Sequence, residues 1–154
     1  MKIPKATKAD IAGFLAQKRI AVAGLSRSGQ AMSNMAYKEF KDRGYELFPV
    51  NPSAAEIGGE RCYHSVSELK GKADAVIAFT QPAVTASVVK EAAAAGMKRI
   101  WIQQGAESEA ALAEAKAAGM SAIAGQCILM HLEPVGSLHK VHGFFARLFG
   151  AAPR

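Results

Sequence analysis

The sequence predicts an α/β fold in which helices cover both faces of a parallel sheet. Five short apolar segments alternate with helical segments along the chain, and the links between them are short. Strands that are buried on both faces require such unbroken apolar runs, and the alternation is typical of a doubly wound sheet. Because crossovers between parallel strands are right-handed, we expect the strand order 3-2-1-4-5.

The five predicted strands each end in a turn that contains glycine, proline or a polar residue. The first strand, at 19–24, carries four apolar residues in succession. The other strands are expected at 45–50, 73–79, 99–103 and 121–124. Their carboxyl ends should meet at one edge of the sheet.

Three longer helices are predicted between the strands, and a glycine follows each of them, as it commonly follows the last helical residue. These helices are expected at 33–43, 83–95 and 108–118, with a shorter helix at 65–69 before the third strand. Alanine is abundant in them, which favours helix formation. Together they supply the two layers that a doubly wound sheet needs.

One further helix is expected on each side of this alternation. Thr7 can cap a helix that runs to Gln17, and an apolar stripe predicts a C-terminal helix at 137–149. No linker-like segment divides the chain. We therefore expect residues 1–154 to form one domain, with a core at 18–127 and a helical extension at 128–154.

The composition is that of a globular protein with an excess of positive charge. Half of the residues are hydrophobic, and the formal net charge is +6. No apolar run is long enough to span a membrane, and the N-terminus lacks a secretory signal, so we expect a cytoplasmic protein without a membrane partner. The lysines are scattered and no stretch interleaves aromatic residues with arginines, which argues against nucleic acid and leaves a polyphosphate ligand to explain the charge.

The loop after the first strand is the most informative candidate for a ligand site. In open α/β sheets, ligands bind at the carboxyl ends of the strands. This loop starts at Gly24, carries hydroxyl groups and an arginine, and leads into a helix whose N-terminus can bind phosphate. The loop therefore predicts a ligand that contains phosphate.

Two common phosphate-binding signatures do not fit this loop. Its two glycines are five positions apart, unlike the Gly-x-Gly-x-x-Gly of dinucleotide dehydrogenases, and no Gly-Lys-Ser or Gly-Lys-Thr follows. The second strand ends in Val50-Asn51-Pro52, without the acidic residue that holds the ribose of NAD. These differences argue against NAD and ATP hydrolysis, whereas NADP stays open.

Five motifs together resemble the stand-alone CoA-binding domain family, which is similar to the N-terminal domain of the succinyl-CoA synthetase α subunit. They are Ala23–Ser26, Phe48–Pro52, Gly59–Tyr63, Trp101–Gly105 and Gly125–Cys127. The resemblance implies a Rossmann-like fold and a site for coenzyme A or an acyl-CoA.

The resemblance also implies a role for each strand-end loop. The loop at 26–30 would hold the CoA pyrophosphate, the segments at 51–53 and 80–82 would flank the adenosine, and 103–105 would lie along the pantetheine. Cys127 would sit near the thiol. The residues expected to bind the cofactor are Gly24, Ser26, Arg27, Ser28, Gly29, Gln30, Asn51, Pro52, Ser53, Thr80, Gln81, Pro82, Gln103, Gln104, Gly105 and Cys127.

The chain departs from the synthetase in ways that bear on function. Ser53-Ala54-Ala55 stands where the synthetase has a lysine, and Gln103-Gln104 stands where it uses a glutamate. The synthetase's phosphohistidine belongs to a second domain, which is not part of this sequence. The resemblance therefore implies a binding module without catalytic residues, either a homodimer or the partner of an acyl-CoA enzyme.

Two other functions compete with this interpretation. One is a small NADP-dependent oxidoreductase, although the sequence offers no Tyr-x-x-x-Lys pair in an obvious place to donate a proton. The other is a protein-interaction module with a vestigial pocket, which would bind through the helix at 137–149.

The cysteines and histidines each leave a further choice. Cys127 could form a mixed disulfide with CoA, but free cysteines are more often small buried hydrophobes, and Cys62 has weaker claims. His139 and His142 lie three apart on one helical face, with His131 and Glu133 nearby. Packing of that helix explains its pattern better than a metal does, and we expect no metal site.

Overall fold

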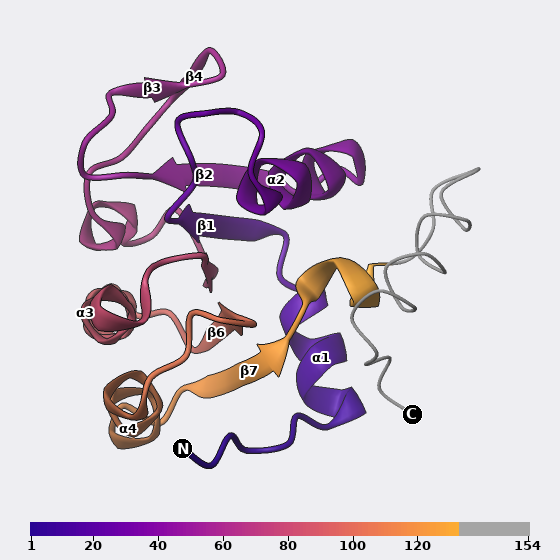
Figure 1. Cartoon of the computed structure of the whole chain (residues 1–154), viewed down its shortest axis with the longest axis vertical. Coiled ribbons are helices and arrows are strands. Elements are labelled where there is room, and N and C mark those ends of the chain that lie inside the picture. Colours follow the sequence, from indigo (N-terminus) through magenta and orange to yellow (C-terminus); the bar gives the residue numbers. More distant parts are fainter. Residues whose placement is uncertain (133–154) are drawn as a thin grey trace.

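The computed structural model describes residues 1–132, and a five-stranded parallel sheet forms its centre (Figure 1). The strands lie in the order β2-β1-β5-β6-β7, and every neighbouring pair is parallel. The predicted α/β, Rossmann-like fold class is confirmed. The strands are β1 (Arg19–Ala23), β2 (Glu46–Val50), β5 (Ala75–Ala78), β6 (Arg99–Gln103) and β7 (Ser121–Gln126).

The predicted strand order is wrong. When the five strands of this sheet are counted along the chain, the order is 2-1-3-4-5 and not 3-2-1-4-5. The reason lies in Pro49, which has no N–H to donate and which sheets therefore tolerate on an edge strand. The Pro49 carbonyl points away from β1 and accepts a hydrogen bond from the N–H of Tyr63 at 2.8 Å. No further strand can pair fully with that side of β2, so β5 pairs with β1 instead.

The segment after β2 covers part of this exposed edge. Here β3 (Glu56–Ile57) and β4 (Glu60–Arg61) form a short antiparallel pair. The chain then returns to the sheet, where Tyr63 forms a parallel bridge with Val50 and accepts the N–H of Asn51 at 2.8 Å. Covered edges are less prone to pair with another chain.

Helices lie on both sides of the sheet, as Figure 1 shows. The 3-10 helix η1 (Val66–Leu69), α3 (Pro82–Ala94) and α4 (Glu109–Ala117) cover one face. The other face carries the remaining helices, which are α1 (Lys8–Leu15), α2 (Met32–Asp42) and the 3-10 helix η2 (Ile128–His131). The predicted helix at 137–149, with His139 and His142, lies outside the described residues.

The N-terminal helix begins where the sequence predicted. Thr7 accepts the N–H of Asp10 at 3.0 Å, and the Asp10 carboxylate accepts the N–H of Thr7 at 3.0 Å. This reciprocal capping satisfies two backbone donors that a helix start otherwise leaves unpaired. Phe14, one turn later, then packs edge-on against the ring of Trp101 with the ring centroids 5.5 Å apart.

The core has two layers because successive residues of a strand point to opposite faces. Ile100 and Ile102 of β6 lie in the layer under α3 and α4, and Trp101 between them lies in the layer under α1 and α2. All three are fully buried. The alternation fixes β6 in register, since a slip of one residue would exchange the layers.

His131 packs against the core layer under α1 and α2, and we expect it to make the free energy of unfolding depend on pH. Its ring packs against Trp101 at a centroid distance of 5.2 Å, its Nε2 lies 3.1 Å from Oε1 of Gln126, and burial lowers the pKa of His131. The folded chain therefore binds fewer protons at this site than the unfolded chain does just below the unfolded pKa of about 6.5.

We expect the free energy of unfolding to fall as the pH drops from 7.5 to 5.5, and His131→Gln to reduce that fall. Urea unfolding of both proteins at the two pH values measures the difference. An equal loss in both would place the pH sensitivity elsewhere.

Candidate functional site

The carboxyl ends of β1 and β5 form the point where the chain connections diverge. The chain leaves β1 for β2 on one side, whereas β5 lies on the other side of β1. Such a divergence leaves a crevice in which open α/β sheets bind ligands. A cavity of about 380 Å³ opens here, between the loop after β1, the start of α2, the end of β5 and the turn after β6.

Gly24 allows these strand ends to approach each other. Its φ is +82°, in the left-handed region that favours glycine. A Cβ at this position would lie 2.9 Å from both the carbonyl carbon and the oxygen of Phe79. The Phe79 N–H in turn donates to the carbonyl of Ala23 at 2.8 Å, which ties the end of β5 to the end of β1. Only glycine fits this turn without displacing backbone.

The loop after Gly24 is held by its own hydroxyl groups. Ser26 Oγ accepts the N–H of Ser28 at 3.2 Å, and Ser28 Oγ accepts the N–H of Gln30 at 3.1 Å. Ser33 Oγ, from the first turn of α2, accepts the N–H of Ser26 at 3.1 Å. These backbone donors are therefore engaged inside the loop and are not free for a phosphate.

The first turn of α2 keeps two donors without a partner in residues 1–132. Asn34 accepts the N–H of Ala31 and donates its amide to the carbonyl of Ser26, which joins the helix start to the loop. The backbone N–H groups of Met32 and Ser33, which follow Ala31, make no hydrogen bond within that range. An anion in the cavity could accept both, and the helix dipole favours it there.

Gln103 places an amide group at the wall of the cavity. It is 4% exposed, and its Oε1 accepts the N–H of Ile128 at 3.0 Å. The register of β6 against β7 shifts at this point, where Gln103 pairs with Gln126. Gln103 Nε2 donates to the sulfur of Met32 at 3.4 Å. Because a thioether is a weak acceptor, this N–H is available to a stronger one.

Thr80 joins the cavity to the start of α3. Its hydroxyl lies 2.8 Å from that of Thr85, which is fully buried and donates to the carbonyl of Ala106 at 2.7 Å. The N–H of Gly105, which also lines the cavity, is held by the carboxylate of Glu107 at 3.0 Å. The turn after β6 is thereby fixed against α3.

Six of the residues expected to bind the cofactor line this cavity. They come from the ends of β1, β5 and β6, three of the five strand ends that the sequence predicted to meet at one edge of the sheet. They are Gly24, Ser26, Thr80, Gln103, Gln104 and Gly105.

The remaining expected residues lie outside the lining. Asn51 donates to the carbonyl of Leu25 at 3.1 Å and so ties the end of β2 to the loop. Cys127 is 2% exposed and packs in the core layer under α1 and α2. The other residues outside the lining are exposed on neighbouring turns: Arg27, Ser28, Gly29, Gln30, Pro52, Ser53, Gln81 and Pro82.

Five lining residues were not anticipated: Ala31, Met32, Ser33, Phe79 and Ala106. Each follows or precedes a predicted motif by a few positions. Phe79 was missed because it was counted as the last residue of the strand predicted at 73–79, and only the turn after it was expected to bind. Met32 and Ser33 could have been found, since the start of the helix after a glycine loop faces the ligand in this class of site.

Cys62 is not activated in this structure. It is buried, its sulfur lies 3.8 Å from the carbonyl oxygen of Tyr63, and burial raises the pKa of the Cys62 thiol. A thiol with a raised pKa forms little of the reactive thiolate at neutral pH.

Two further kinds of site were searched for in residues 1–132. No group of three or more His, Cys, Asp or Glu residues in this range could hold a metal ion. None of its helices combines the length and the apolar character that crossing a bilayer demands.

The contact at Gly24 makes a testable prediction. Gly44 has a similar φ of +84°, but a Cβ there would meet nothing within 4 Å. Gly44→Ala should cost about 1–2 kcal/mol for the left-handed backbone. Gly24→Ala should cost at least about 1 kcal/mol more, because its methyl group also displaces the backbone of Phe79. Urea unfolding measures both, and equal losses would contradict the close contact.

Known proteins resemble this chain over most of its length. Residues 18–133 match the model of the CoA binding domain family. An uncharacterized protein of Bacillus subtilis strain 168, YneT, is 36% identical over 123 residues, which make up 79% of this chain and 91% of that protein. A hypothetical protein from Pyrococcus horikoshii OT3 has a solved structure with a TM-score of 0.77 and 30% identity, covering 85% of this chain and 96% of the other.

A longer enzyme shares part of the same region. The ADP-forming acetate–CoA ligase of Methanocaldococcus jannaschii is 28% identical over 81 residues, which are 53% of this chain and 12% of the ligase. The family match covers the whole parallel sheet and every segment that lines the cavity. The chain therefore belongs to the CoA-binding domain family.

Proposed function

We propose that this protein binds coenzyme A or an acyl-CoA in the cavity at the ends of β1, β5 and β6. The observation that carries the proposal is the convergence of the Gly24 turn, the first turn of α2 and the turn at Gln103–Gly105 on one cavity of about 380 Å³. Membership of the CoA-binding domain family supports the identity of the ligand.

The phosphate end of the ligand would lie at the first turn of α2. The N–H groups of Met32 and Ser33 make no hydrogen bond within residues 1–132 and line the cavity. Ser26 adds a hydroxyl at the same wall, and the exposed Arg27 adds a positive charge beside it. A pyrophosphate accepts hydrogen bonds and charge of this kind at helix N-termini.

The pantetheine arm would pass along Gln103. A pantetheine amide carbonyl is a stronger acceptor than the Met32 sulfur that Gln103 Nε2 contacts at 3.4 Å. Phe79 and Ala106 provide apolar surface on the same cavity wall. The arm contains both amide and methylene groups, and this wall offers partners to each.

We further propose that the protein binds without catalysing a reaction of its own. Within residues 1–132, the side chains that line the cavity include no His, Cys, Asp, Glu, Lys or Tyr. The hydroxyl of Thr80 contacts another threonine, and that of Ser26 contacts a serine, so neither has a base beside it to remove a proton. Such a module would present the cofactor to a partner acyl-CoA enzyme or respond to its concentration.

Isothermal titration calorimetry with CoA, dephospho-CoA, pantetheine and NADPH tests the ligand. We expect saturable binding of CoA that is tighter than that of pantetheine, because the phosphates contact α2. No heat of binding with CoA at millimolar concentration, in a protein shown to be folded, would overturn the proposal. Tighter binding of NADPH than of CoA would favour the oxidoreductase alternative.

Arg27 allows a sharper test of the phosphate end. Arg27→Glu should lower CoA affinity about tenfold or more, since it replaces an attractive charge by a repulsive one beside the phosphates. Lys116→Glu makes the same change of charge in the last turn of α4, on an exposed residue outside the cavity lining. This control should stay within about twofold, because salt screens distant charges. Equal weakening in both variants would indicate a general effect of net charge instead.

A further inference from the structure

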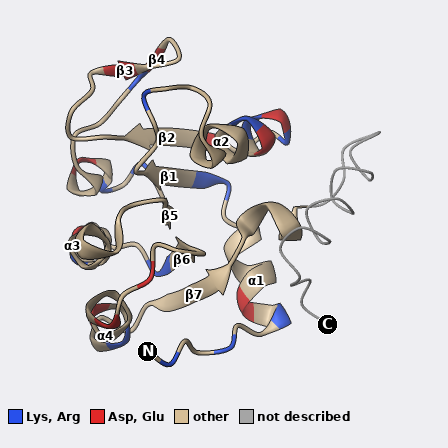
Figure 2. Ribbon diagram, in the orientation of Figure 1, with Lys and Arg blue, Asp and Glu red and all other residues tan. Residues whose placement is uncertain are grey.

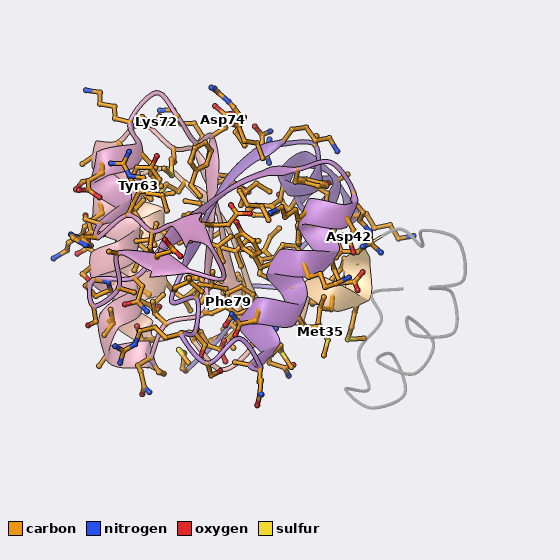
Figure 3. All side chains as sticks on the ribbon, turned by 90° about the horizontal axis from the view of Figure 1, so that it is seen from above. Met35, Asp42, Tyr63, Lys72, Asp74 and Phe79 are labelled. Carbon is orange, nitrogen blue, oxygen red and sulfur yellow. The ribbon has the colours of Figure 1, made fainter. Side chains whose placement is uncertain are left out.

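A second cavity lies at the amino ends of the strands, whereas the first lies at their carboxyl ends. Its volume is about 640 Å³, and it is bounded by the turn before β1, the loop before β5 and the turn between α3 and β6. Figure 3 shows Asp74, which lines this cavity, at the edge of the molecule opposite Phe79, which lines the first one. The two cavities share no lining residue.

Positive charge dominates the lining of this second cavity. Lys70, Lys98 and Arg99 line it, and no ion pair or hydrogen bond joins their side chains to any part of residues 1–132. Figure 2 shows basic positions at the start of β1 and at the start of β6.

The negative groups near the cavity are already engaged. Asp74 receives two hydrogen bonds from Arg19, one from Nε at 2.9 Å and one from Nη2 at 2.8 Å. Asp10 of α1, which interacts electrostatically with Arg99, accepts the hydroxyl and the N–H of Thr7 at its carboxylate. Asp74 is thus paired with Arg19, Asp10 keeps its charge near Arg99, and the lining still carries three cations to one carboxylate.

The backbone carbonyls at the end of α3 are occupied by backbone N–H groups and not by these cations. Three backbone N–H groups fold back onto them: Ala95 donates to Glu91, Gly96 to Ala93 and Met97 to Ala92, each at 3.0 Å. This arrangement occupies carbonyls that a lysine often binds at a helix end. Lys98 follows directly and is exposed.

The guanidinium of Arg99 lies beside Gly13 of α1, which has no side chain. A Cβ at Gly13 would lie 2.4 Å from Nη1 and 2.8 Å from Cζ of Arg99, so the guanidinium lies against the bare backbone of the helix. Glycine inside a helix costs about 1 kcal/mol relative to alanine. Gln17 lines the cavity beside it, and its amide is fixed by donation to the Gly13 carbonyl at 3.1 Å. The guanidinium of Arg99 therefore occupies space that a larger side chain at position 13 would share.

From these observations we propose that the second cavity is a separate binding site for a small anion that carries two or more phosphate groups. A guanidinium binds phosphate oxygens through two parallel hydrogen bonds, and the two lysines add charge without fixed direction. The site does not depend on the CoA cavity.

The test is a titration of the whole chain with sodium tripolyphosphate at constant ionic strength, followed by amide NMR spectra. We expect saturable shifts at Gly71 and Gly96, which line the second cavity. Shifts at Gly24 and Gly105 report on the first cavity separately. Shifts that grow linearly without saturation, or that occur at the first cavity alone, would overturn the proposal.

Variants identify the groups that bind. Lys98→Gln combined with Arg99→Gln should weaken binding at Gly71 and Gly96 at least about tenfold, as expected when charge-assisted hydrogen bonds are lost. Lys5→Gln combined with Lys116→Gln removes the same charge from exposed positions and should change it within about twofold. Equal weakening in the two pairs would overturn the proposal.

Two further variants and two further ligands test the proposal independently. If the double variant at 98 and 99 does not fold, Lys70→Gln offers a single change at an exposed side chain of the same cavity. This variant should fold normally and bind more weakly. Arg99→Lys should bind between the wild type and Arg99→Gln, because the charge stays and the planar fork is lost. Citrate that binds as tightly as tripolyphosphate would contradict selectivity for phosphate. CoA that shifts Gly71 and Gly96 more strongly than tripolyphosphate would contradict the separation of the two sites.

Discussion

The absence of an N–H at Pro49 constrains the whole sheet. The nitrogen lies on the outer side of β2, where the carbonyl of the same residue already accepts from Tyr63. Because β2 must stay at the edge, β5 pairs with the other side of β1. That pairing brings Phe79 against Gly24 and opens the cavity between them. The strand order thus determines which strand end lies beside Gly24.

The polar residues around the cavity divide into those that hold the chain and those that face the ligand. Ser28 and Asn34 satisfy backbone groups of the loop and the start of α2, and Asn51 anchors the loop to β2. Gln103 does both, because its oxygen is fixed by Ile128 and its nitrogen meets only a sulfur. A hydroxyl or an amide in a ligand-binding loop is therefore not by itself evidence of contact with the ligand.

The sequence predicts the elements of this fold better than their arrangement. Apolar runs and helix-ending glycines locate the five strands and the helices, because these signals are local. Strand order depends on which edge can accept a neighbour, and only Pro49 carried that information. The same limit applies to the site: Gly24, Thr80 and Gln103 follow from strand ends, whereas Met32 and Phe79 depend on the packing of α2 and the adjacency of β1 and β5. Cys127 was placed near the cofactor by resemblance, but the layer under α1 and α2 buries it.

Trp101 gives the protein an internal optical reporter. It is the single tryptophan of the chain and is fully buried in the middle of β6, with its indole N–H bonded to the carbonyl of Gln126 at 3.1 Å. The strand that carries it begins at Arg99 in one cavity and ends at Gln103 in the other. Emission from this indole comes from a dry environment whose neighbours are Phe14 and His131. Its wavelength and quenching therefore follow the packing of α1 and η2 on the sheet, without any label added to the protein.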